Sequence, residues 1–354
     1  MESLPKISVV IPIRNEARYI ERTVRYVREQ DYPGDKLEIL VVVGDSVDDT
    51  AAIVQEIAAQ DPLVKYFHNP RSWSSAARNI GIENATGEIV TFIDGHTYID
   101  NDQLLRNTAR LLEEQNVLVL SRPQFLDTPE NSHFQKAVSL ARKSLVGHGL
   151  DSTIYNDRDE AVDPVSSGAT YSRKVIDKVG PFDERFDACE DVEFNYRVHK
   201  AGFGSFTSLK LAVYYYPRGS LRALFRQMTR YGMGRFRLAC KHPDTLSPGT
   251  LVPFLLTVGL PLLAIASFLH PALRYIFLAA VGLYALMVIP SSLVVAARHG
   301  WSFFFVLPPI YLAVHTGLGY GFLKELTRTV FGRGVDFSND AANPKQTESA
   351  GKTG

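Results

Sequence analysis

The feature that most constrains this 354-residue chain is the uneven distribution of its apolar residues. Three long apolar runs cover residues 251–268, 275–297 and 301–323, and each approaches the ~20 residues that cross a hydrocarbon core. Short polar breaks separate the runs. A bundle of buried core helices is the alternative, but the runs carry almost no charge. We therefore predict a C-terminal membrane domain of three segments at residues 246–324.

The number of complete membrane crossings is left open at two or three. Positive charge directly after the last run favours a cytosolic C-terminus, whereas three full crossings would place that end outside. Residues within the second and third runs could also break or bend a crossing: Pro290, Pro308, Pro309, Gly317, Gly319 and Gly321. The polar residues 325–354 are expected to form a disordered tail.

Composition narrows the class of the remaining chain. The 38 basic and 38 acidic residues give zero net charge, which disfavours a nucleic-acid partner. Two cysteines, Cys189 and Cys240, cannot build a disulfide framework and fit a reducing compartment. The N-terminus lacks the basic-then-apolar pattern of a signal peptide, so we expect the first domain to remain in the cytosol.

The first domain, residues 1–216, alternates short β-branched runs with helical stretches. Asn15 is expected to cap a helix with an apolar stripe that includes Ile20 and Val24. Strands separated by helices imply a mostly parallel sheet with helices on both faces, an α/β fold that binds ligands at the carboxyl ends of its strands. The predicted strands cover residues 7–13, 37–43, 64–67, 88–93 and 117–120, and helices are predicted at 74–84 and 102–114.

Acidic and amide side chains follow the first two strands. They are Asn15 and Glu16 after the first, and Asp45, Asp48 and Asp49 after the second. No glycine-rich dinucleotide motif or P-loop motif follows any of the strands, which disfavours a dinucleotide-binding site and a P-loop nucleotide site. Carboxylate and amide oxygens suit ribose hydroxyls, a base N–H or a divalent metal. Each residue alone could simply cap a loop, but together they favour a binding site.

Two further pairs of residues could carry chemistry. Asp94 and His96 are two residues apart on an extended segment, where they can share a metal, and an imidazole inclines the preference toward Mn²⁺ over Mg²⁺. A polar turn is the alternative, and the spacing alone does not decide. Glu190 and Asp191 open a predicted helix, where acids either complement the helix dipole or supply a general base.

Residues 217–245 link the two domains and have the composition of a helix lying in the lipid headgroup plane. Apolar residues recur at helical spacing, and seven basic residues occur between 217 and 241 with no acidic one. A solvated basic face is the alternative, but the adjoining apolar runs favour a membrane surface. We therefore predict an amphipathic interfacial helix with membrane lipids as partners.

Taken together, these motifs resemble those of inverting family 2 glycosyltransferases of the GT-A fold. The resemblance is to the bacterial membrane-anchored branch typified by the succinoglycan glucosyltransferases of exopolysaccharide assembly. The matching segments occur in the family's order at residues 9–16, 48–50, 77–81, 86–96, 168–171, 179–184, 190–191 and 227–232.

The resemblance implies a role for each matching residue. The donor nucleotide sugar would be bordered by Pro12, Arg14, Glu16, Asp45, Asp48, Arg78 and Asp94. A divalent metal, Mn²⁺ or Mg²⁺, would be held on the diphosphate by Asp94 and His96. The catalytic base would be Asp191, with Glu190 beside it. The interfacial helix would cover the donor sugar and diphosphate with Gln227, Arg230 and Tyr231.

Two positions depart from the family's pattern. Family members usually carry two adjacent acids before Gly-Ser, but residues 43–46 contain only Asp45, which leaves open which acid meets the base. Tyr231 stands where processive polysaccharide synthases have tryptophan in a Gln-x-x-Arg-Trp element.

The implied function is inverting transfer of a sugar from a nucleotide-diphosphate sugar, a UDP-hexose, to a polyprenyl-diphosphate-linked sugar. The reaction would occur at the cytosolic face of the cell membrane, in exopolysaccharide or cell-surface glycan assembly, and the protein would be multi-pass. One alternative is a polyprenyl-phosphate monosaccharide synthase. A non-catalytic, membrane-anchored nucleotide-sugar-binding protein is another, and the missing glycine fingerprint disfavours a membrane oxidoreductase.

Overall fold

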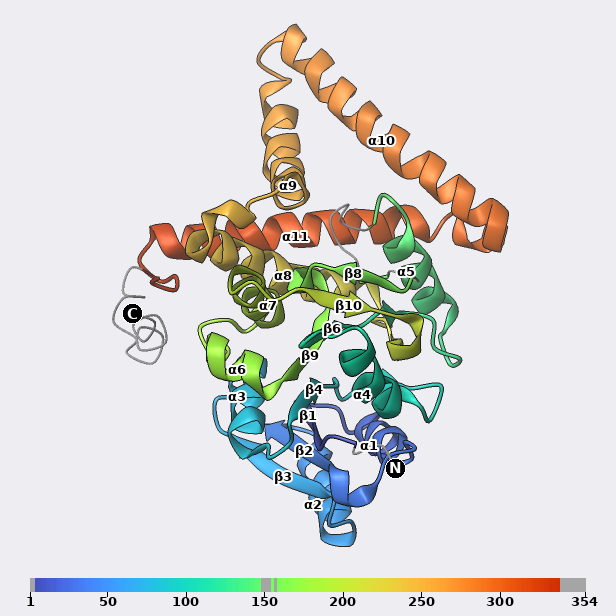
Figure 1. The fold of residues 1–354 in the computed structure, drawn as a ribbon. Coiled ribbons are helices and arrows are strands. Elements are labelled where there is room, and N and C mark those ends of the chain that lie inside the picture. The colour runs from blue at the N-terminus through green and yellow to red at the C-terminus, as the bar shows by residue number, and fades with distance from the viewer. Residues whose placement is uncertain (1–3, 148–153, 156–157, 338–354) are drawn as a thin grey trace. The chain divides into compact units, whose positions relative to one another are not determined.

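The computed structural model describes residues 4–147, 154–155 and 158–337 (Figure 1). The chain divides into two compact units. In the described residues, the first unit comprises 4–128 and the segments from 154 to Tyr216, and the second comprises 129–147 and Pro217–Phe337. Residues 129–147 therefore group with the second unit, although they lie between two parts of the first in the sequence.

Within the described residues, the main sheet of the first unit has eight strands in the order β3-β2-β1-β4-β9-β6-β10-β8. β1, β2, β3 and β4 are mutually parallel, whereas β9 runs antiparallel to both of its neighbours. The strands are β1 (Ile7–Ile13), β2 (Leu37–Gly44), β3 (Val64–Asn69), β4 (Ile89–Phe92), β6 (Val119–Ser121), β8 (Glu160–Val162), β9 (Gly168–Ser172) and β10 (Ser205–Thr207). The predicted mostly parallel sheet is confirmed, and its five predicted strands correspond to β1, β2, β3, β4 and β6.

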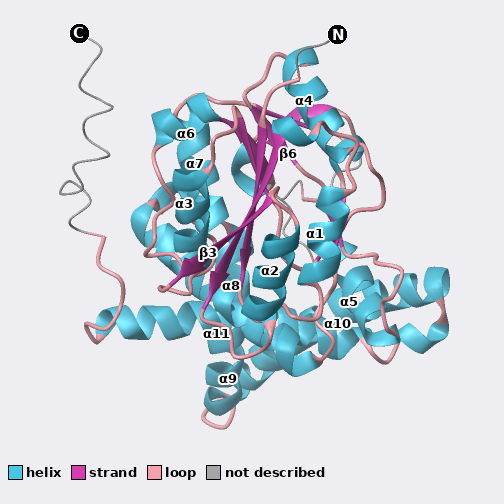
Figure 2. Ribbon diagram, turned by 90° about the horizontal axis from the view of Figure 1, so that it is seen from below, coloured by secondary structure: helices cyan, strands magenta, loops and turns pink. Residues whose placement is uncertain are grey.

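Helices cover both faces of this sheet (Figure 2). Because side chains alternate along a strand, odd-numbered residues of β1 such as Val9 and Ile11 pack into one core and Val10 packs into the other. The first core includes residues of α1 (Ile20–Arg28), α2 (Thr50–Gln60) and α4 (Leu104–Glu114). The second includes residues of α3 (Ser74–Asn84), α6 (Arg173–Val179) and α7 (Glu190–Lys200).

A smaller sheet adjoins the strand ends and consists, in the described residues, of β5 (Thr97–Tyr98), β11 (Val213–Tyr215) and β7 (Gln124–Phe125). β11 is the middle strand, antiparallel to β5 and parallel to β7. It places Tyr215 beside His96, with ring centroids 5.5 Å apart. The segment that follows β4 is thereby paired with β11, the last strand of the first unit in the sequence.

The prediction that Asn15 caps α1 is wrong. α1 begins at Ile20, its N-cap is Tyr19, and no side chain caps it. Asn15 instead has a left-handed backbone conformation with φ 57°. Its side-chain oxygen accepts a hydrogen bond from the amide of Val47, so it joins two loops rather than starting a helix.

A buried carboxylate ties together the amino ends of the strands. Glu38 accepts hydrogen bonds from the Ser8 hydroxyl at 2.6 Å and the Thr86 amide at 2.6 Å, and forms a 2.8 Å ion pair with Lys65. Burial alone would raise the pKa of Glu38, but the bonds from Lys65, Ser8 and Thr86 outweigh it and lower the pKa to about 2. The carboxylate therefore stays charged over the physiological range.

Replacing Glu38 by glutamine is expected to lower the free energy of unfolding at neutral pH by about 1–3 kcal/mol, because the charged hydrogen bonds are lost. The folded pKa lies below the unfolded value of about 4.3, so this stabilisation is present above that pH and is lost as the pH falls toward 2. Thermal unfolding of both proteins from pH 7 to pH 3 measures this. The difference should shrink on acidification, and Glu114→Gln, at an exposed pair with Arg110, should change little. A difference that is constant with pH would contradict the assignment.

The second unit is helical. Its longer helices in the described residues are α5 (His133–Lys143), α8 (Leu221–Lys241), α9 (Pro248–Ala266), α10 (Pro271–His299) and α11 (Leu307–Val330). α10 continues through Pro290, and Pro308 and Pro309 lie in the first turn of α11, where a missing N–H costs little. The prolines and glycines of the apolar runs therefore do not interrupt these helices.

α8 and α11 pack against each other over much of their length (Figure 1). Glycines permit this approach, because a Cβ at Gly232 would clash with the carbonyl of Leu318 and a Cβ at Gly321 with that of Thr229. Beyond the glycines, Arg237 Nε and Glu325 Oε1 form a buried ion pair at 2.8 Å. The predicted interfacial helix is thus joined to the third apolar run.

Among the described residues, α9 and α10 are long and apolar enough to cross a membrane, with mean hydropathies of 2.0 and 2.2. α11, which contains most of the third run, buries one side against α8 and is not one of these two. Its place as a third membrane segment remains a prediction.

Candidate active site

The loops after β1 and β2 are joined by hydrogen bonds at the carboxyl edge of the sheet. Arg14 Nε donates to the Asp45 carbonyl at 3.1 Å, and the Asn15 amide donates to the Ser46 hydroxyl at 3.0 Å. Pro12 lies just before them in β1, paired with Val42 of β2. The structure therefore brings together the residues predicted to border the nucleotide.

The two acids after β2 have different surroundings. Asp45 is exposed, and its 2.9 Å contact with His68 Nε2 lowers its pKa. Burial would raise the pKa of Asp48, but hydrogen bonds from Thr50 and the Ala17 amide lower it. Asp48 thus organises the start of α2, whereas Asp45 keeps an exposed carboxylate. His68, at the end of β3, was missed because it lies outside every matching segment.

Asp94 and His96 follow β4, and each lies near a different charged side chain. Asp94 Oδ1 lies 3.5 Å from Arg78, and His96 Nδ1 lies 3.1 Å from Glu16 Oε1. Gly95 between them packs so tightly on Ile13 that a Cβ would clash there. No cluster of three or more potential metal ligands occurs among the described residues. Carboxylate and imidazole donors nevertheless fit a divalent ion whose remaining ligands come from a donor diphosphate and water.

Arg78 of α3 lies at the centre of a buried charge cluster. Its guanidinium is within 3.5 Å of Asp94 Oδ1 and 3.4 Å of Glu190 Oε1, and it stacks over the rings of Phe92 and Phe182. Burial would lower the pKa of Arg78, but the charges of Glu190 and Asp94 outweigh it and raise the pKa. Arg78 therefore stays charged and connects the predicted metal ligand to the acidic start of α7.

Glu190 and Asp191 are adjacent but differ in availability. Burial raises the pKa of Glu190, although Arg78 opposes the shift. Asp191 is half-buried, and its carboxylate accepts only the Val192 amide of its own helix among the described residues, at 2.9 Å. Of the two acids, Asp191 is the one left to bind another group.

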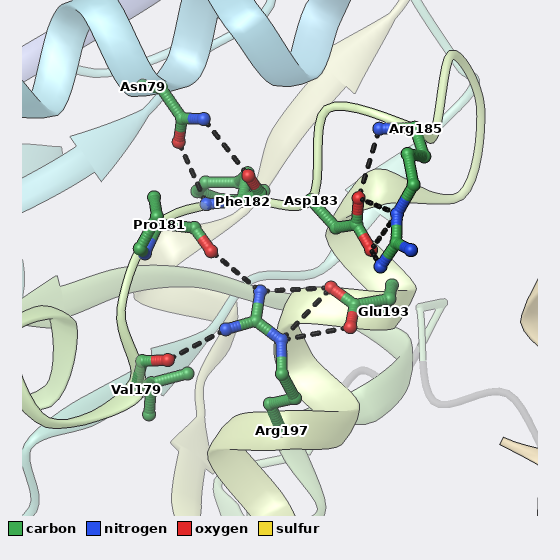
Figure 3. Close-up of polar contacts among 8 residues, drawn as sticks. All are labelled: Asn79, Val179, Pro181, Phe182, Asp183, Arg185, Glu193 and Arg197. Carbon is green, nitrogen blue, oxygen red and sulfur yellow. Dashed lines mark hydrogen bonds and ion pairs between the residues drawn. The ribbon is translucent and has the colours of Figure 1, made fainter. Parts of the chain in front are cut away.

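Arg197, which forms a buried ion pair with Glu193 of the same helix, ties α7 to the segment before it (Figure 3). Glu193 and Arg197 lie one turn apart at 2.9 Å, and Arg197 also donates to the carbonyls of Val179 and Pro181. Asn79 of α3 exchanges hydrogen bonds with the backbone of Phe182. The 179–184 motif thus anchors the helix that presents Asp191.

Arg122, between β6 and β7, is a buried cation that sequence reasoning missed. Its guanidinium donates to the Phe92 carbonyl at 2.8 Å and to the hydroxyls of Thr91 and Thr170. Burial lowers its pKa, and the charge of Asp94 opposes that shift. An arginine immediately after a predicted strand was the only signal that could have indicated it.

The three residues predicted to cover the donor lie on α8, in the second unit. Gln227 donates a 3.2 Å hydrogen bond to the hydroxyl of Tyr231, one turn away. Arg230 and Tyr231 are both exposed. Their role toward the donor remains a prediction.

A mostly parallel sheet flanked by helices, with acidic residues at its carboxyl edge, gives this unit a GT-A-like fold. A mannosyltransferase from Pyrobaculum calidifontis, solved with GDP-Man and Mn²⁺, has this fold, with a TM-score of 0.56, 21% identity, and 88% of each chain covered. Residues 8–180 match Glycosyl transferase family 2. The chain belongs to this family.

Relatives from three further organisms extend the comparison. The succinoglycan biosynthesis protein ExoA of Rhizobium meliloti is 31% identical over 242 residues, covering 66% of this chain and 70% of that protein. A Methanococcus voltae glycosyltransferase named for a dolichyl N-acetylglucosaminyl phosphate acceptor is 25% identical and covers 91% of this chain and 97% of its own length. A Campylobacter jejuni glucosyltransferase named for an undecaprenol-diphosphate-linked glycan is 33% identical over 32% of this chain and 35% of its own.

Proposed function

We propose that this glycosyltransferase moves a hexose from a nucleotide-diphosphate donor, with inversion, to a sugar on a polyprenyl-diphosphate lipid. The reaction takes place at the cytosolic membrane face, with UDP as the favoured nucleotide, in exopolysaccharide or cell-surface glycan assembly. The membrane placement is supported by α9 and α10, and the lipid-linked acceptor by the names of the Methanococcus and Campylobacter relatives.

The observation that carries the proposal is the free carboxylate of Asp191 beside the Arg78 charge cluster. A single displacement needs one base on the acceptor side, which removes the hydroxyl proton as that oxygen attacks. Asp191 has no side-chain partner among the described residues, whereas Glu190 is buried against Arg78. In this mechanism Asp191 accepts the proton and Glu190 holds Arg78.

The donor side must accommodate negative charge, because breaking the sugar–phosphate bond leaves it on the diphosphate. Asp94 and His96 would hold a divalent metal, which supplies Lewis-acid stabilisation of that charge when bound. Arg78 fixes the position of Asp94, and Arg14 and Asp45 line the predicted nucleotide side of the same sheet edge.

A screen of nucleotide sugars against the purified full chain with Mn²⁺ tests the proposal, with release of nucleoside diphosphate as the readout. Product analysis with a lipid-linked sugar acceptor then separates the possibilities. An extended glycolipid supports the proposal. A monosaccharide lipid formed from polyprenyl phosphate would instead identify a monosaccharide synthase, and absence of turnover with every donor would contradict both.

Removal of divalent metal by EDTA is expected to abolish release of nucleoside diphosphate, and added Mn²⁺ should restore it. His96→Ala should raise the Mn²⁺ concentration for half-maximal rate by about tenfold or more, because one metal ligand is lost. His199→Ala is the matched control, since the imidazole of His199 is half-exposed and pairs with Asp163. An unchanged Mn²⁺ requirement in His96→Ala would remove His96 from the metal site.

A further inference from the structure

A groove of about 520 Å³ lies between α8 and α11 within the second unit. Thr316 and Arg222 supply its polar lining. The remaining lining residues are apolar: Leu221, Phe225, Pro309, Leu312 and Ala313. The groove is therefore a trough of hydrocarbon-like character with one cationic side chain.

The apolar lining remains uncovered in the folded chain. Leu221 is 41% exposed and Leu312 is 49% exposed, although both lie where two helices meet. Covering such side chains with another apolar group is favourable in proportion to the area removed from water. The groove therefore offers an apolar surface to a ligand with a hydrocarbon part.

Two cations lie on the same side of α8. Arg222 lines the groove and Arg226 follows one turn later, so their side chains are neighbours on the helix surface. Neither has an ion pair or hydrogen bond with any residue in the described ranges, and both are exposed. An unpaired arginine binds phosphate oxygens strongly and with defined geometry.

We propose that the α8–α11 groove binds the isoprenoid chain of the lipid acceptor, with the adjoining phosphate on Arg222 and Arg226. The identity of the lipid rests on the proposed function, whereas the combination of trough and cations is a property of the second unit. One trough beside one pair of cations fits a lipid with a single hydrocarbon chain, while a phospholipid brings two.

Binding of undecaprenyl phosphate to the full-length protein in phosphatidylcholine nanodiscs tests this. Leu312→Glu places a charge in the trough and Arg222→Gln removes the cation, and each should weaken binding by at least about tenfold. Matched controls lie at the junction of α9 and α10. Leu269→Glu alters an exposed leucine in the loop and Arg274→Gln an exposed arginine in the first turn of α10, and both should stay within about twofold of the native protein.

Further probes separate the two parts of the site. Undecaprenol, which lacks the phosphate, should lose affinity in Leu312→Glu and not in Arg222→Gln. Inorganic phosphate should show the reverse. If Leu312→Glu fails to fold, Leu312→Trp fills the trough while keeping it apolar and should weaken binding of both undecaprenyl lipids.

Two results would overturn the proposal. One is unchanged binding of undecaprenyl phosphate in both groove variants. The other is phosphatidylglycerol displacing the probe at equal concentration, which would make the groove a general anionic-lipid site. Release of nucleoside diphosphate, measured on the same preparations, keeps this test separate from that of the proposed function. Lipid binding without any sugar transfer would contradict the function and leave the groove assignment standing.

Discussion

Turnover is expected to fall by about 10²-fold or more when Asp191 is replaced by asparagine, because the change removes the carboxylate that we propose as the proton acceptor. Donor affinity should stay nearly unchanged, since Asp191 makes no side-chain contact in the described residues except with its own helix amide. Steady-state release of nucleoside diphosphate gives the rate, and calorimetric titration of the donor gives the affinity.

Two comparisons make this result specific. Asp177→Asn changes an exposed carboxylate on α6 of the same unit and should leave the rate as it was. Glu190→Gln should lower the free energy of unfolding, because it removes a negative charge that compensates the buried guanidinium of Arg78. A collapse of donor affinity in Asp191→Asn would place Asp191 in the donor site, and full turnover would assign the base to another residue.

Replacing Arg78 by methionine is expected to be the most destabilising single change in the site. It leaves the carboxylates of Glu190 and Asp94 without their shared cation, and breaking a buried pair in this way costs about 3–5 kcal/mol. Thermal unfolding of the full chain measures the loss. Arg71→Met, at a more exposed pair with Glu184, is the matched control and should cost much less.

A double variant distinguishes loss of charge balance from loss of packing. Adding Glu190→Gln to Arg78→Met removes one unpaired buried charge and should restore part of the lost stability. Turnover should stay low in the double variant, because Asp94 still lacks the contact that positions it. If the Arg78→Met protein unfolds at the same midpoint temperature as the native protein, the cluster does not stabilise the fold.

The sheet could be predicted from sequence because its strands are continuous β-branched runs that are buried on both faces. β2 is an example, with all eight residues buried. A helix on the protein surface would carry polar residues on one side, so an apolar run of this length favours a buried strand. The Asn15 prediction failed because asparagine serves equally in a helix cap and in a left-handed turn. Only the partner across the loop, the amide of Val47, decides between them.

The residues of the candidate site could be proposed from the sequence, but the contacts that connect them could not. Acids after strands indicate a sheet edge, so Asp45 and Asp94 could be selected from sequence, and Asp191 could be selected as an acid at the start of a predicted helix. The assignment of Arg78 to the interior of the charge cluster depends on burial by α3 and α7, which are distant in sequence. Arg122 shows the same limit, since a single arginine after a strand gives no sign that three neutral acceptors enclose it.

The close packing of α8 on α11 has a consequence for the order in which the protein is made. α8 leaves the ribosome before α9, α10 and α11. The partners of its glycine surface and of the Arg237 guanidinium lie on α11 and are synthesised later. α5 waits longer still, since it packs on α11 from an earlier part of the chain. The second unit therefore completes its core only after the two apolar helices have been synthesised, and a nascent chain halted after α10 would lack Glu325, the ion-pair partner of Arg237.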